Sequence, residues 1–177
     1  PGEPLSGAPQ SRPASSRRLL IIGVVVAMLA LLGAGGFFGY RAYVQGEETK
    51  LILQAQAALA SGDPAAAEQA ANAALALTPA GFQKQTDAAL AARGEALVAQ
   101  QKYAAALPDL SAALAADPQN AELLALRGRA YLAEEQVQEA LADFSASLAL
   151  DSQNAELLAR RGQAYLAHGD TGRAIDD

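Results

Sequence analysis

The feature that most constrains this chain is an internal repeat with a period of 34 residues. The segment QNAELLA at 119–125 recurs at 153–159, and Arg127-Gly128 recurs as Arg161-Gly162 in the same register. The stretch AYLA at 130–133 likewise returns at 164–167. A fixed period of about 20–50 residues is typical of arrays in which one supersecondary unit stacks on the next. The sequence therefore predicts a stack of similar units.

Within each period, the apolar and small residues fall at helical spacing. One stripe of a first helix would carry Leu124, Gly128 and Tyr131, and one stripe of a second helix would carry Ala140 and Phe144. A lone hairpin of two such helices leaves both stripes uncovered. Stacking the next hairpin buries them, so three or more units are needed for stability. The predicted fold class is all-α.

A period of 34 with small, aromatic and alanine positions resembles the tetratricopeptide family over residues 51–177, about 70% of the chain. The resemblance implies a right-handed superhelical solenoid of antiparallel helix hairpins. It places a divergent hairpin at 51–80, full units at 87–120 and 121–154, and a truncated unit at 155–177. Pro79 and Pro118 are five residues further apart than the period, which predicts a longer helix or an added loop near 82–100. Pro108 is expected to kink a second helix.

Polar residues mark where the helices start. Asn120 and Asn154 are predicted to cap first helices, and Asp63 precedes Pro64 as a cap followed by proline at the first helical position. An arginine precedes the small residue of each unit, as Arg93, Arg127 and Arg161. These arginines are predicted to pair with a carboxylate of the adjoining hairpin and to be structural.

The segment before the repeats has a different composition. Residues 1–18 form a basic arm rich in Pro and Ser, which is predicted to be disordered because it has too little apolar surface to bury. Residues 19–40 contain no charge, and at about 1.5 Å per residue a helix of that length crosses a hydrocarbon core of about 30 Å. We predict a single transmembrane helix over 19–40, then a juxtamembrane linker over 41–50.

A cleaved signal peptide is the competing interpretation of the apolar segment. Its apolar run exceeds the usual length of about 7–15 residues and continues through Phe37 and Phe38, which favours an uncleaved anchor. Three arginines precede the run, and only Arg41 and Lys50 follow it closely, which predicts a cytoplasmic N-terminus with the repeats on the extracytoplasmic side.

Gly35 and Gly39 form a G-x-x-x-G pattern that would let another membrane helix pack closely. Because apolar spans are often rich in glycine, the pattern also has a bland explanation. It keeps open a homo-oligomer held together partly through the span.

The sequence offers little for catalysis or for cofactors. The chain has no cysteine, and His168 is its one histidine, so no thiolate or multi-histidine metal site is predicted. The glycines at 33–39 lack the spacing of a phosphate-binding loop. Residues 42–177 hold nine Lys and Arg against eighteen Asp and Glu, which argues against a nucleic-acid partner. We predict no catalytic residue, no metal and no cofactor.

The resemblance implies that the first helix of each unit lines a concave wall that binds a protein or peptide. The partner-binding positions that it implies are Glu95, Val98, Glu122, Arg129, Leu132, Glu156, Gln163 and Leu166. Some family members hold a partner's C-terminal carboxylate with Lys and Asn at such positions. Here Ala and Glu occupy most of them, so that clamp is not expected.

These observations favour a membrane-anchored scaffold or adaptor that assembles a membrane-associated complex and is not an enzyme. One alternative is the extracytoplasmic sensor part of a larger receptor-type kinase whose catalytic domain lies upstream. Another is a structural protein that forms homo-oligomers.

Overall fold

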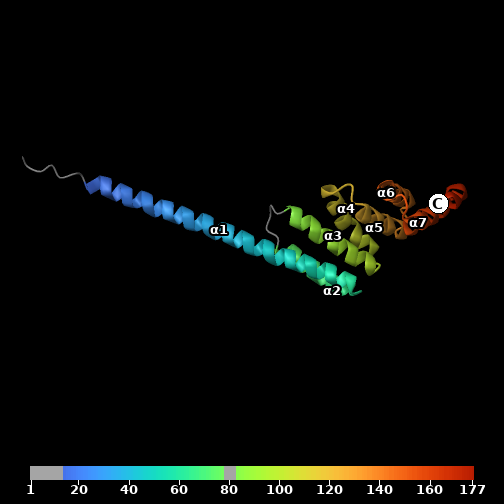
Figure 1. Cartoon of the computed structure of the whole chain (residues 1–177), viewed down its shortest axis with the longest axis horizontal. Coiled ribbons are helices and arrows are strands. Elements are labelled where there is room, and N and C mark those ends of the chain that lie inside the picture. Colours follow the sequence, from blue (N-terminus) through green and yellow to red (C-terminus); the bar gives the residue numbers. More distant parts are fainter. Residues whose placement is uncertain (1–13, 78–82) are drawn as a thin grey trace, which may run out of the picture. The chain divides into compact units, whose positions relative to one another are not determined.

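The computed structural model describes the backbone of residues 14–77 and 83–177, and the side chains of residues 33, 36–77 and 86–177. Every element in these ranges is a helix (Figure 1). The chain divides into two compact units, Pro1–Tyr43 and Val44–Asp177.

Helix α1 covers Ala14–Ala60. The predicted span at 19–40 falls within it, but most side chains of that segment, with that of Leu19 and the surroundings of Gly35, lie outside the described residues. Within the described residues, the structure contains no helix with an apolar stretch long enough to cross a membrane. Around Gly39, the space that a side chain would occupy is open.

The start and end of α1 differ from the sequence-based boundaries. Residues 14–18, predicted to be part of a disordered arm, are helical, and residues 1–13 lie outside the described part of the chain. Residues 41–50, predicted as a linker, are also helical. This stretch contains no proline and only one glycine, Gly46, so nothing in it ends a helix. The first hairpin therefore uses the end of α1 as its first helix.

The second unit is a row of helix hairpins, as the repeat predicts. The end of α1 pairs with α2 (Pro64–Leu77), and α3 (Gln83–Ala99) pairs with α4 (Tyr103–Ala116). Next come α5 (Ala121–Ala133) with α6 (Val137–Leu150), and α7 (Ala155–His168) with the short α8 (Thr171–Asp176). Each second helix also packs on the first helix of the following hairpin, which makes the row a solenoid (Figure 1).

The predicted caps are confirmed. The Asn120 side chain accepts a hydrogen bond from the backbone N–H of Leu123 at 3.1 Å, and Asn154 does the same for Leu157 at 3.0 Å. Asp63 accepts from the backbone N–H of Ala66 at 2.9 Å, directly before Pro64 opens α2. Each cap satisfies a donor that the first turn of a helix cannot pair internally.

The irregular unit is accommodated within α3. This helix has 17 residues, whereas α5 has 13, so the extra residues lengthen the first helix of the unit. Helix α4 continues through Pro108 from Tyr103 to Ala116.

Close contacts between paired helices rely on the small positions. A methyl group added at Gly128 would lie 2.7 Å from the ring of Phe144, and one at Gly94 would lie 2.8 Å from Leu110. Both large side chains are fully buried. Between α1, α2 and α3, the buried positions are alanines, including Ala55, Ala67 and Ala96. The small residues thus set how closely the helices approach, and the large ones fill the space that remains.

Candidate partner-binding groove

The first helices of successive hairpins lie next to one another, since α3 contacts α5 and α5 contacts α7. A hollow of about 510 Å³ opens where the end of α1, α3 and α5 meet. Its lining consists of Gln56, Leu59, Ala60, Glu95, Val98, Ala99, Glu122, Leu126 and Arg129.

Two further hollows continue from the first one. A hollow of about 430 Å³ shares Gln56, Glu95 and Glu122 with it and extends towards the end of α4. Another, of about 440 Å³, shares Glu122, Leu126 and Arg129 and reaches α6 and α7. Because adjacent hollows have lining residues in common, the three form one groove. We call it the first-helix groove.

Five of the predicted binding residues line these three hollows: Glu95, Val98, Glu122, Arg129 and Glu156. Val98 is only 1% exposed, so it forms part of the core beneath the groove and offers little surface to a partner.

The other three predicted residues lie elsewhere. Leu132 lines a smaller hollow of about 190 Å³ together with Tyr103, Arg129 and Arg160. Gln163 and Leu166 are exposed on α7, and Leu166 is 58% exposed.

Several groove residues were not predicted. Gln56 and Leu59 belong to the end of α1, which sequence analysis did not align with the first helices of the later units. Leu126 and Arg160 are on α5 and α7, and Arg160 lines two of the hollows. The period of 34 could have located part of this set, because Arg160 follows Leu126 by 34 residues.

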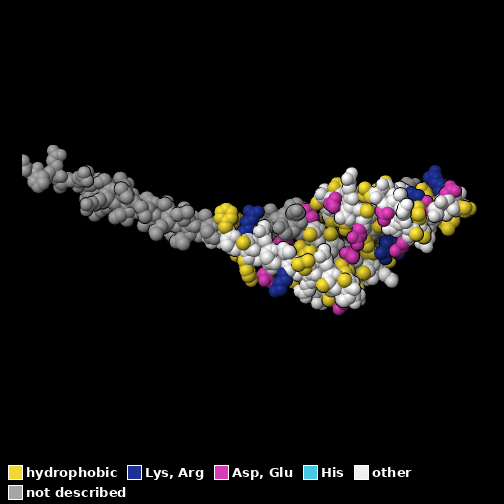
Figure 2. All heavy atoms as spheres, in the orientation of Figure 1, with side chains coloured by type: hydrophobic (Ala, Val, Ile, Leu, Met, Phe, Trp, Pro, Cys, Tyr) yellow, Lys and Arg dark blue, Asp and Glu magenta, His cyan; other side chains and the backbone are white. Residues whose placement is uncertain are grey.

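The charges in the groove are arranged unevenly. Partial burial, reinforced by the negative charge of Glu122, raises the pKa of the Glu95 carboxyl above its ordinary value. Arg160 donates a hydrogen bond of 2.7 Å to the exposed carboxylate of Glu156 and thereby lowers the pKa of Glu156. Arg129 has no ion pair with another described residue. Figure 2 shows acidic and basic side chains among apolar ones on the visible face of the repeats.

The repeated arginines form a separate, internally paired set. Arg127 donates two hydrogen bonds to Asp143, at 2.7 and 2.8 Å, and its third nitrogen lies 3.5 Å from the Ser111 hydroxyl. Arg161 pairs in the same way with Asp177 and contacts Ser145. The predicted structural role is supported, but the carboxylate comes from the second helix of the same hairpin. The preceding hairpin supplies a neutral hydroxyl instead of the predicted acid.

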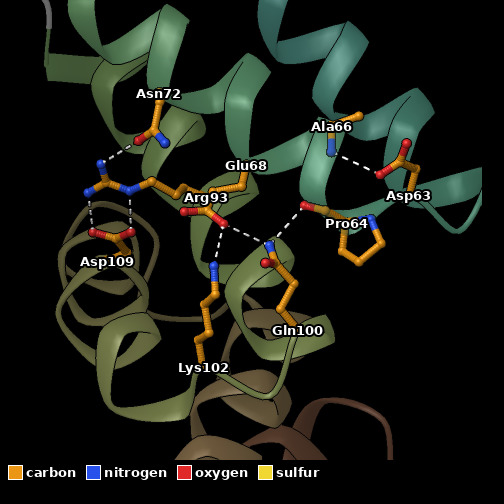
Figure 3. A network of polar contacts seen from close by, with 9 residues as sticks. All are labelled: Asp63, Pro64, Ala66, Glu68, Asn72, Arg93, Gln100, Lys102 and Asp109. Carbon is orange, nitrogen blue, oxygen red and sulfur yellow. Dashed lines mark hydrogen bonds and ion pairs between the residues drawn. The ribbon is translucent and has the colours of Figure 1, made fainter.

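The first and second hairpins are joined by a related network (Figure 3). Arg93 pairs with Asp109 at 2.6 Å and reaches back to Asn72 on α2 at 3.0 Å. Close by, Glu68 on α2 accepts hydrogen bonds from Lys102 at 3.0 Å and from Gln100 at 2.8 Å. These contacts fix the divergent hairpin onto the regular ones.

Other chemistry has little support in the described part of the chain. No three His, Asp or Glu side chains come together there as a metal site. His168 is exposed at the end of α7. The arrangement of the groove suits recognition of an extended or helical segment by shape and charge.

Comparison with known proteins gives a consistent result. A family model described as tetratricopeptide repeat matches residues 52–121, 91–155 and 126–177, and these ranges overlap to cover the repeats without a gap. No curated protein matches the chain.

Similar solved structures share the fold. MamA 41-end from Desulfovibrio magneticus RS-1 has a TM-score of 0.64 and 23% identity, covering 86% of this chain and 86% of that one. A MamA RS-1 double mutant has a TM-score of 0.64 and 24% identity, covering 77% and 76%. A tetratricopeptide repeat protein from Parabacteroides merdae has a TM-score of 0.61 and 25% identity, covering 74% of this chain and 50% of that one.

Proposed function

Because the chain belongs to the tetratricopeptide repeat family, we propose that it is a membrane-held scaffold whose first-helix groove binds a protein or peptide partner. The fold is one typical of protein–protein interaction, and members of the family are typically non-catalytic scaffolds. The observation that carries the proposal is the continuity of the groove, because hollows between three successive hairpins share their lining residues.

Groove binding is tested with two substitutions that change its lining. Arg129→Glu reverses the charge at the junction of the hollows, and Leu132→Asp puts a carboxylate on a half-buried apolar position. Purification of the tagged full chain from its own membranes should lose its partner in both variants, while circular dichroism stays unchanged. Glu139→Lys, at an exposed position on α6, is the control and should keep the partner. Retention of the partner by both groove variants would rule out this binding surface.

The same purification distinguishes hetero-partners from self-association. If the captured protein is a second copy of the chain carrying a different tag, the scaffold binds itself, and the homo-oligomer becomes the better account.

The membrane part of the proposal rests on the uncharged segment 19–40 and on the aromatic residues at its end. Phe37, Phe38, Tyr40 and Tyr43 are each 60–67% exposed. With about 3.6 residues per turn, they point to several sides of α1, so one protein face could not cover them all. Aromatic side chains around a helix, next to an apolar run, suit the boundary between lipid and water.

Membrane attachment and orientation are tested by labelling. The chain has no cysteine, so Ser6→Cys and Ser152→Cys each introduce a unique thiol. We expect the full chain to stay with the membrane after alkaline extraction. A maleimide that cannot cross membranes should label residue 152 in cells whose cytoplasmic membrane is intact and should not label residue 6. The opposite labelling would reverse the orientation, and extraction into the aqueous phase would remove the anchor.

A further inference from the structure

The charges that face the first-helix groove are not paired with one another. Glu122 and Arg129 both lie on α5, and seven residues at about 1.5 Å each place their backbones about 10 Å apart. Glu95, Glu122 and Arg129 make no ion pair with any residue that the structure describes. By contrast, charges between paired helices are matched, as in Arg127 with Asp143 at 2.7 Å. The groove therefore holds separated charges that a bound partner can complement.

The two carboxylates approach the same place from neighbouring helices. Glu95 on α3 and Glu122 on α5 both line the hollows of about 510 and 430 Å³, and they are close enough to influence each other electrostatically. The apolar side chains of Leu59 and Leu126 line the larger hollow beside them. A cation placed between the carboxylates would relieve their mutual repulsion, and its aliphatic stem would lie along the apolar wall.

An amine or guanidinium fits this position better than a metal ion does. Calcium takes about six to eight oxygen ligands, and two carboxylates on separate helices supply fewer. A lysine or arginine needs only hydrogen-bond acceptors of opposite charge on either side.

We propose that the first-helix groove binds a polypeptide segment whose basic side chain docks between Glu95 and Glu122 and whose acidic side chain meets Arg129. The inference rests on the proposed function and names the class of partner. The distance of about 10 Å between Glu122 and Arg129 corresponds to about three residues of an extended segment or seven of a helix. Opposite charges in this order would also fix the direction in which the segment lies.

The test uses a random peptide library displayed against the full chain in lipid nanodiscs. We expect the selected peptides to be enriched in Lys or Arg followed by Asp or Glu at one of these two spacings. A selected peptide is then synthesised, and its affinity is measured by fluorescence polarisation. Replacing its basic residue with Gln should weaken binding by about tenfold or more.

Variants of the scaffold identify the docking position. Glu95→Gln with Glu122→Gln should weaken the parent peptide by a similar factor and should have little further effect on the peptide that lacks its basic residue. The matched control is Glu134→Gln with Glu139→Gln, which removes two exposed carboxylates outside the hollows and should leave affinity unchanged. Equal affinity of the parent peptide for the wild type and for the Glu95/Glu122 variant would overturn the inference.

A separate variant distinguishes failure of this inference from failure of the scaffold proposal. Ala99 is exposed in the groove, so Ala99→Tyr should obstruct the groove without disturbing the core. If Ala99→Tyr abolishes binding of peptides that carry no basic residue, the groove binds polypeptides but the charge assignment is wrong. If no selected peptide responds to Ala99→Tyr or to the paired glutamate substitutions, both proposals fail.

Discussion

Gly128 and Gly162 occupy equivalent positions in successive units, yet they have different neighbours. A methyl group at Gly128 would clash with the buried ring of Phe144, whereas the nearest atom at Gly162 is a backbone oxygen of Ala174 at 3.4 Å. We expect Gly128→Ala to lower the free energy of unfolding by about 1–3 kcal/mol. Gly162→Ala should be neutral or raise it by up to about 1 kcal/mol, because alanine favours helix. Denaturant titration measures both, and equal losses would contradict this packing.

Arg127 and Arg160 both pair with carboxylates, but only the first pair is shielded from water. The side chains of Arg127 and Asp143 are 21% and 9% exposed, whereas Glu156, the partner of Arg160, is 73% exposed. Arg127→Met leaves a buried carboxylate without its partner and should cost about 3 kcal/mol of stability. Arg160→Met should cost less than about 1 kcal/mol. Thermal denaturation of the two variants should therefore give clearly separated midpoints.

Glu95 connects the stability of the fold to pH. Burial and the charge of Glu122 raise its folded pKa above the unfolded value, so its contribution favours the fold at low pH and is lost as pH rises through the folded pKa. Glu95→Gln should therefore be more stable than the wild type at pH 7, and the difference should shrink towards pH 4. Paired thermal melts at the two pH values measure this, with Glu134→Gln as the exposed control. A difference that grows on acidification would contradict the sign.

At the scale of elements, the turn inside each hairpin places one residue in the left-handed region. Gly62 and Gly169 have φ of 78° and 85°, whereas Gln101 and Glu135 hold the equivalent turns with φ of 61° and 60°. A side chain in this conformation costs about 1–2 kcal/mol, part of which glycine returns through its greater freedom when unfolded.

Exchanging the residues at these turns should therefore change stability in opposite directions. Gln101→Gly and Glu135→Gly should each stabilise the chain by up to about 1 kcal/mol, and Gly169→Ala should destabilise it by a similar amount. No other atom lies within 4 Å of the added methyl group at Gly169, so a loss there would reflect backbone strain alone. Denaturant titration decides the point, and destabilisation by both glycine substitutions would refute it.

Local signals explain which elements could be predicted. The caps at Asn120 and Asn154 and the small position at Gly128 follow from short-range pattern, and the structure confirms them. The end of α1 was misplaced because charged residues after Tyr40 suggested a linker, although charges alone do not end a helix. The partner of each arginine depends on how two helices face one another, which helical spacing does not specify. The recurrence of Asp109, Asp143 and Asp177 at the same period was the missed signal.

At the scale of the whole molecule, the groove could be predicted only where the repeat is regular. Glu95, Glu122 and Arg129 follow from their equivalent positions in successive units. Gln56 and Leu59 escaped prediction because the first hairpin diverges and borrows its first helix from α1. Which charges remain unpaired depends on distances between helices, and only the folded stack establishes them.

The most direct test of the groove is a map of partner contacts on the full chain in its own membranes. A photo-crosslinking amino acid is placed at Ala99 or Ala133, which are exposed in the hollows, or at Ala142 or Ala146, which are exposed on α6. Illumination should give a polypeptide adduct of defined mass from residues 99 and 133, suppressed by an excess of a selected peptide, and none from residues 142 and 146. Adducts from α6 alone, or equal yields from all four positions, would contradict binding in the first-helix groove.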